Sequence, residues 1–211
     1  MCNKISKQFE RKVEDELLKV VNIGVSDTHD TLTFFRNEFS EWSSFQAKSK
    51  ATTQLSHNKI TVPTAPLSAI IENHGTPYYV KIDIEGFELK AISTLSKKGP
   101  LPVYLSFEVN QDWLRILDLL ETLGFDGFQI VRQGKGFLPD PPNPAREGAL
   151  WPKPFNNNQS GCFGLELSGD WLERAGMDAA MARETLDAGA RQARGDARGW
   201  HDIHARRGSA L

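Results

Sequence analysis

The clearest hydrophobic pattern in the chain is an apolar stretch at 78–84 that carries two carboxylates near its end. Asp83 and Glu85 alternate with isoleucines, Gly86 follows, and apolar side chains then recur with helical spacing over 87–95. This order predicts a buried parallel strand that leads into a helix. Because open α/β sheets bind ligands at the carboxyl ends of their strands, the two carboxylates are candidates for a functional site.

The rest of the chain alternates between helical and extended patterns. Helical spacing is found at 5–19, 67–71, 113–123 and over most of 170–207. Extended patterns are found at 20–25, 31–35, 60–62, 103–108, 128–131 and 161–167. The segments 36–58 and 133–159 have no clear period and are expected to form long loops. The alternation predicts an α/β fold with parallel strands joined by right-handed crossovers.

Composition excludes several classes of protein. Lys and Arg number 25 against 27 Asp and Glu, a balance that does not favour a nucleic-acid partner. No apolar run approaches the ~18 residues that a membrane helix needs, and residues 1–7 lack the apolar core of a secretory signal. Cys2 and Cys162 are the only cysteines and suggest neither a disulfide framework nor a zinc site. We therefore expect a cytoplasmic protein without a membrane or nucleic-acid partner.

The carboxylates at the end of the 78–84 stretch admit two interpretations. Two residues apart on an ideal strand, Asp83 and Glu85 would point to one face, where they could accept a proton, position a hydroxyl or hold a divalent cation. Alternatively, Glu85 caps the following helix. Lys81 shares this face and could neutralise the pair. Glu108 ends the next strand and would either line the same pocket or form a surface salt bridge.

Three other groups of polar residues are less specific. Ser26 and Asp27 follow the strand at 20–25, where Asp27 could simply be a turn residue. Trp42 and Ser43 lie in the first long loop, which could cover an acceptor or be anchored in the core by the tryptophan. Near the end of the chain, His201, Asp202 and His204 are expected to hold the tail by hydrogen bonds, and no metal is assigned to them.

Taken together, several segments resemble the FkbM family of S-adenosylmethionine-dependent methyltransferases. The main ones are Lys81–Gly86, Val25–Asp27, Ser106–Glu108 and the turn Leu123–Phe125. Further likeness to one subgroup lies in Trp42–Phe45, Ser160–Gly164 and Gly199–Arg206. The resemblance covers nearly the whole chain, and it rests on the order and spacing of these segments rather than on any single motif.

The resemblance implies a Rossmann-like sheet and transfer of a methyl group from S-adenosylmethionine to a hydroxyl of a small acceptor, a sugar or secondary metabolite. It implies catalytic roles for Asp83, Glu85 and Glu108. Ser26 and Asp27 would bind the cofactor, and Lys81, Trp42 and Ser43 would bind the acceptor.

One departure from the family pattern concerns the start of the chain. No glycine-rich strand-to-helix turn precedes residue 20, so the first two strands of the family's sheet are expected to be missing. Residues 1–168 would then be a partial methyltransferase domain, and residues 169–211 a helical C-terminal extension. A truncated chain is the leading explanation, and we expect weak or no binding of S-adenosylmethionine.

Loss of the central strand would also leave strands at 20–25 and 78–84 without their shared neighbour. They would pair with each other, or the sheet would find a partner in a second copy or in a missing N-terminal segment, or the product would be poorly folded. A different class of function stays open: a non-catalytic α/β module that binds a protein partner through the 36–58 loop and the helical tail.

Overall fold

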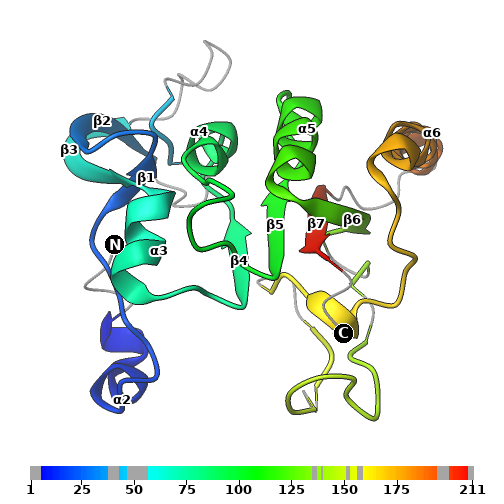
Figure 1. Ribbon diagram of the computed structural model, residues 1–211, viewed down its shortest axis with the longest axis horizontal. Coiled ribbons are helices and arrows are strands. Elements are labelled where there is room, and N and C mark those ends of the chain that lie inside the picture. The colour runs from blue at the N-terminus through cyan, green and yellow to red at the C-terminus, as the bar shows by residue number, and fades with distance from the viewer. Residues whose placement is uncertain are drawn as a thin grey trace. The chain divides into compact units, whose positions relative to one another are not determined.

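The computed structural model describes residues 6–37, 43–46, 57–134, 137–138, 140–150, 153–155, 159–193 and 200–208. The chain divides into two compact units, Met1–Pro66 and Leu67–Leu211 (Figure 1). The boundary predicted between residues 168 and 169 stays a prediction. None of the helices in the described part of the chain has the length and apolar character that crossing a bilayer requires.

Each unit contains helix and strand, so the predicted mixed α/β class is confirmed. The first unit contains α2 (Glu10–Glu14), β1 (Gly24–Ser26), β2 (Asp30–Asn37) and β3 (His57–Pro66). The second contains α3 (Leu67–His74), β4 (Tyr79–Ile82), α4 (Glu88–Ser93), β5 (Tyr104–Glu108), α5 (Trp113–Leu123), β6 (Phe125–Arg132), η3 (Gly164–Glu166), η4 (Arg174–Gly176), α6 (Met177–Ala193) and β7 (His201–Arg207).

A three-stranded sheet forms the first unit, in the order β1-β3-β2. β1 runs parallel to β3, and β2 runs antiparallel to it from Asp30 opposite Thr64 to Asn37 opposite His57. The Thr64 hydroxyl donates to the backbone carbonyls of Thr28 and Asp30, each at 3.2 Å, which fixes the turn between β1 and β2. β1 therefore has β3 as its partner, and not the strand at 78–84.

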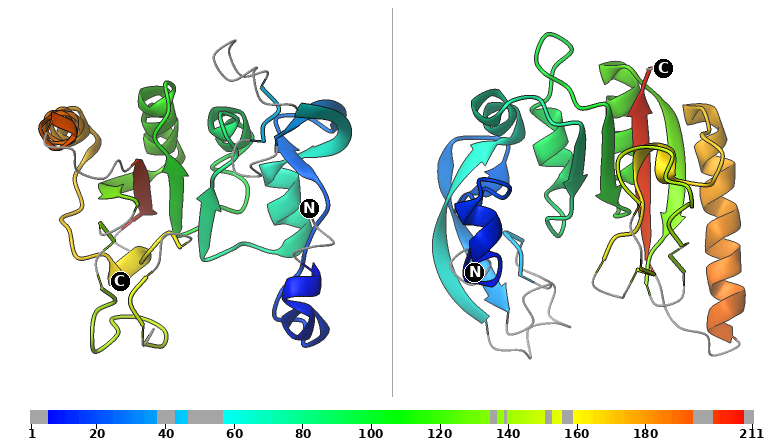
Figure 2. Two further views of the ribbon diagram at one scale, coloured as in Figure 1. Left: turned by 180° about the vertical axis from the view of Figure 1, so that it is seen from behind. Right: turned by 90° about the horizontal axis from the view of Figure 1, so that it is seen from below.

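A four-stranded sheet forms the centre of the second unit, in the order β4-β5-β7-β6. β4 and β5 are parallel, as predicted, and β7 runs antiparallel to both β5 and β6. Figure 2 shows β7, in red, between these two strands. The C-terminal segment thus closes the middle of the sheet.

The core of this unit lies on one face of the sheet. Every second residue of the strands is buried on this face, and α4 and α5 contribute the other apolar side chains. They include Ile82, Leu105, Phe107, Phe128, Ile203, Ala91, Ile92, Ile116, Leu117 and Leu120. α5 places Leu123 in the same core and ends at Gly124, whose φ of 94° is a left-handed conformation that glycine adopts without a Cβ clash. This helix follows the predicted bounds.

Four predicted elements differ from the structure. Residues 201–207 were expected to continue a helix, but they form β7, because Ile203 and Ala205 alternate toward the core. Residues 161–167 were expected to be a strand, but positive φ angles at Gly161 and Gly164 exclude it and only η3 forms. The helix predicted at 5–19 shortens to α2, which buries no residue. The strand predicted at 20–25 is represented in the structure by the three residues of β1, Gly24–Ser26.

Candidate carboxylate site

Three carboxylates meet at the carboxyl ends of β4 and β5. Ile82 lies opposite Phe107 in the parallel register, so Asp83 comes level with Glu108 at the end of β5. Asp83, Glu85 and Glu108 each offer an oxygen, and these oxygens all lie within 4.8 Å of one another. Asp83 is exposed and the two glutamates are half-buried. The structure therefore brings together the three residues that the order of strands suggested.

The route by which Glu85 reaches this cluster differs from the prediction. β4 ends at Ile82, so Asp83 and Glu85 do not share the face of an ideal strand. Glu85 has φ 54° and Gly86 has φ 99°, both in the left-handed region. A tight turn, rather than the alternation of a strand, directs the Glu85 side chain toward Glu108.

Glu88 holds this turn together. Its side chain is 1% exposed, and its carboxylate accepts hydrogen bonds from the backbone N–H of Ile84 at 3.1 Å and of Gly86 at 3.0 and 3.1 Å. The Asn110 side-chain amide donates to the same carboxylate at 2.6 Å. Glu88, and not Glu85, thus satisfies the backbone donors ahead of α4. Sequence reasoning missed it, although an acidic residue in the first turn of a predicted helix is a known signal.

A buried ion pair lies beside the carboxylates. Lys81 Nζ is 2.6 Å from Oδ2 of Asp202 and 3.8 Å from Oδ2 of Asp83. The Asp202 side chain is fully buried, and its Oδ1 has no hydrogen-bond partner among the described residues. Burial raises the pKa of Asp202, whereas the Lys81 ammonium lowers it. Lys81 therefore joins β7 to the cluster, and its predicted role in binding an acceptor stays a prediction.

Glu108 is the carboxylate whose acidity changes most clearly. Burial raises its pKa, and neighbouring carboxylates raise it further, to about 7. These neighbours are Asp83, Glu85, Asp202 and Glu88. Because a general base works best with a pKa near the operating pH, Glu108 is suited to accept a proton at neutral pH.

The face of the four-stranded sheet opposite the apolar core is polar and closely packed. The hydroxyls of Tyr79 and Ser106 are 2.6 Å apart, and the Tyr79 ring stacks on Phe163 with centroids 4.2 Å apart. His204 lies opposite Ser106 on β7 and is buried, which lowers its pKa to about 3. His201 is 3.2 Å from Glu184 of α6. The terminal polar residues thus hold β7 in the sheet by an ion pair, packing and a contact to α6.

The remaining predicted site residues belong to the first unit. Ser26 is fully buried and its hydroxyl donates to Oδ1 of Asp27 at 3.0 Å, while Asp27 is exposed just after β1. Ser43 is buried, next to Ser44, which pairs with Phe35. Trp42 lies outside the described residues. The predicted roles of these residues in binding a donor or an acceptor stay predictions.

The chemistry open to the cluster follows from its charge. Three neighbouring carboxylates attract a cation, either an organic cation such as a sulfonium or a divalent metal ion with oxygen ligands. Glu108 can in addition take a proton from a hydroxyl. A hollow of about 430 Å³ lined by Tyr78 and Phe163 is found elsewhere, and the cluster does not line it.

Comparison with known proteins gives one match. The family model described as the methyltransferase FkbM domain matches residues 4–126, more than half of the 211-residue chain. This range includes Asp83, Glu85, Glu88 and Glu108 and ends before β7. No curated protein and no solved structure matches the chain.

Proposed function

Because the chain belongs to the FkbM methyltransferase domain family, we propose that it transfers a methyl group from S-adenosylmethionine to a hydroxyl oxygen. The acceptor in this proposal is a small molecule, a sugar or a secondary metabolite. The observation that carries the proposal is the position of Glu108 among acidic neighbours, with a pKa of about 7.

Glu108 acts in this proposal as the proton acceptor. When bound, S-adenosylmethionine supplies the methyl carbon that the acceptor oxygen attacks, and S-adenosylhomocysteine leaves. The oxygen–carbon bond forms as the sulfur–carbon bond breaks, and the hydroxyl proton passes to the Glu108 carboxylate. General-base assistance of this kind contributes about 10²–10⁴-fold to a rate.

Asp83 and Glu85 act as the charged surroundings of that step. Their carboxylates favour a cationic sulfonium nearby, and the exposed Asp83 can accept a hydrogen bond from a second hydroxyl of the acceptor. Glu88 acts through the turn that carries Glu85 and is a positioning residue. Lys81 reduces the repulsion among the carboxylates, because its ammonium group lies close to those of both Asp83 and Asp202.

The chemistry of the carboxylate cluster and the family both support S-adenosylmethionine as the donor in this proposal. A sulfonium cation suits the carboxylate cluster. The four strands β4, β5, β7 and β6 would be the part of a Rossmann-like sheet that presents the acceptor side.

A labelled-methyl assay tests the proposal. The full chain is incubated with methyl-labelled S-adenosylmethionine at about 1 mM, the upper end of ordinary KM values, and with a panel of monosaccharides and phenols. We expect label in a methyl ether, with a rate about 100-fold lower in Glu108→Gln. The matched control Glu121→Gln, an exposed position on α5, should retain the wild-type rate. Absence of any methylated product, or an equal rate in Glu108→Gln, would contradict the proposal.

A further inference from the structure

Within the part of the chain that the structure describes, the outer edge of β6 has backbone groups without hydrogen-bond partners. Phe128 exchanges two backbone hydrogen bonds of 2.8 Å with Leu172, on the side away from β7, and Gln133 N donates to Trp200 O at 2.8 Å on the β7 side. Because backbone groups alternate in direction along a strand, Ile130 and Arg132 also direct their N–H and C=O groups away from β7. Among the described residues, no hydrogen bond reaches these outward groups.

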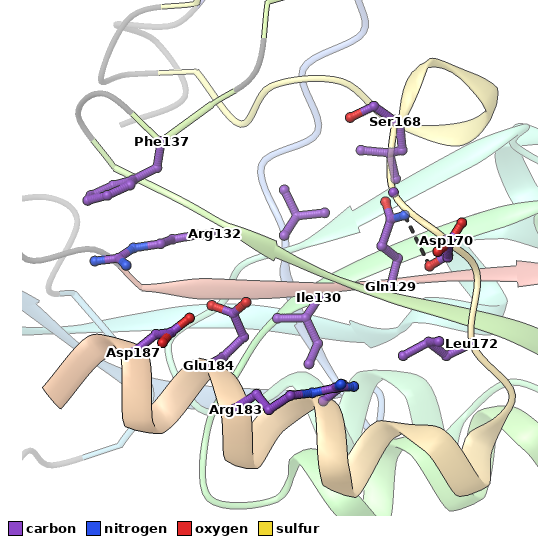
Figure 3. A pocket seen from close by; sticks show the side chains of 14 residues that line it. Gln129, Ile130, Arg132, Phe137, Ser168, Asp170, Leu172, Arg183, Glu184 and Asp187 are labelled. Carbon is purple, nitrogen blue, oxygen red and sulfur yellow. Dashed lines mark hydrogen bonds between the residues drawn. The ribbon is translucent and has the colours of Figure 1, made fainter. Parts of the chain in front are cut away.

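A hollow of about 610 Å³ lies beside this free edge, a size typical of ligand sites. One wall is formed by α6, with Ala180 and Arg183, and another by the segment Leu167–Asp170 (Figure 3). The hollow therefore begins where Leu172 stops pairing with Phe128, and it continues along β6 to Arg132. Its position alongside free backbone donors and acceptors suits an extended chain better than a compact molecule.

The side chain of Arg132 carries hydrogen-bond donors that have no acceptor in the described part of the chain. Its Nε and Nη1 atoms are buried and have no hydrogen-bond partner among the described residues. Its guanidinium carbon lies 3.7 Å from the centroid of the Phe137 ring, so one face of the group is covered. A buried guanidinium nitrogen without an acceptor is costly, and a carboxylate is the acceptor that suits it best.

We propose that an extended peptide with an acidic side chain binds this hollow as an additional strand on β6. Its backbone pairs with Ile130 and Arg132, and its carboxylate accepts hydrogen bonds from the Arg132 guanidinium. Of the acidic residues on α6 that line the hollow, Glu184 lies 3.2 Å from His201, and Arg183, one turn from Asp187, adds a second positive charge to the lining. The site is separate from the carboxylate cluster, and it does not depend on methyl transfer.

Selection from random octapeptides displayed on phage, with the full chain immobilised, tests this proposal. We expect enriched peptides that share an Asp or Glu and alternate apolar residues, and we expect synthetic copies to bind in a calorimetric titration. Arg132→Gln should weaken their binding at least tenfold. The matched control Arg115→Gln, an exposed arginine on α5, should leave it unchanged.

Two further variants test separately whether peptide binding requires the backbone edge of β6 and whether it requires the hollow. Ile130→Pro removes one outward N–H at a position where an edge strand tolerates proline, and Ala180→Trp fills the hollow from α6. Each should abolish peptide binding while thermal unfolding shows that the chain stays folded. If Ile130→Pro does not fold, Ala180→Trp decides alone. No enriched acidic peptide, or equal binding by Arg132→Gln and Ala180→Trp, overturns the proposal. A concentration-dependent dimer that Ala180→Trp disrupts also overturns it, because a second copy would then be the occupant.

Discussion

Lys81 Nζ lies 2.6 Å from Oδ2 of Asp202, and this contact joins β4 to the C-terminal strand β7 across β5. The two residues are 121 positions apart in the chain. The Asp202 side chain is fully buried, whereas that of Lys81 is 23% exposed. The pair therefore stabilises the closure of the sheet by β7 only as long as both charges are present.

Lys81→Met should destabilise the second unit by about 3 kcal/mol, because it leaves a buried carboxylate without its cation. Urea unfolding measures this difference. Lys97→Met, which removes an exposed lysine, should change the free energy of unfolding by less than about 0.5 kcal/mol. The double variant Lys81→Met/Asp202→Asn should be more stable than Lys81→Met alone. Additive losses in the double variant would argue against a specific pair.

Glu88→Gln should destabilise the turn after β4. The neutral amide has one acceptor oxygen in place of two charged ones. It therefore accepts more weakly from the N–H groups of Ile84 and Gly86 and cannot keep every hydrogen bond of the carboxylate, at a cost of about 1–3 kcal/mol. Hydrogen exchange of these two amides should become faster, and amides of α5 should not change. Unchanged exchange at Ile84 and Gly86 would show that Glu88 does not hold the turn.

Glu85 occupies a conformation that costs a non-glycine residue about 1–2 kcal/mol. Glu85→Gly relieves that strain and removes the charge, whereas Glu85→Gln removes the charge alone. We expect Glu85→Gly to be more stable than Glu85→Gln by about 1 kcal/mol in chemical unfolding. If the glycine variant is the less stable of the two, the left-handed turn is not strained.

His204 is expected to make the fold sensitive to acid. Burial lowers its pKa from 6.5 to about 3. Between these two pH values the unfolded chain therefore binds a proton at His204, whereas the folded chain does not. The stability that neutral His204 permits is complete above pH 6.5 and falls as the pH drops from 6.5 toward 3. His204→Leu should therefore lose less stability than the wild type between pH 7 and pH 4, measured by thermal unfolding. Parallel curves for the two proteins would contradict this.

Much of the second unit could be predicted from the sequence because its signals are local. The apolar run at 103–108 and the helical spacing at 113–123, ended by Gly124, appear in the structure as β5 and α5. β7 was missed because Asp202, His204 and Arg206 give its sequence a polar character. These side chains face the polar side of the sheet, where Lys81 and Tyr79 accompany Asp202 and His204, and only tertiary structure provides those partners.

The candidate site, like the fold, could be predicted where its signals are local in the sequence and not where they depend on tertiary structure. Asp83 and Glu108 follow apolar strands, and parallel pairing brings them level, so their proximity could be predicted. The direction of Glu85 and the role of Glu88 depend on two consecutive left-handed residues, and the sequence signals only the second of these, through Gly86. The pKa of Glu108 depends on four carboxylates and on burial, which strand order alone does not specify.

The titration of Glu108 tests the central claim most directly. Glutamate labelled with carbon-13 at the side-chain carboxyl allows each group to be followed by NMR against pH, and Glu108→Gln assigns the resonance. We expect this carboxyl to titrate at about pH 7 in the wild type and at lower pH in Asp83→Asn, because one repelling charge is then removed. A Glu108 carboxyl that titrates near pH 4.5 and does not respond to Asp83→Asn would contradict the account.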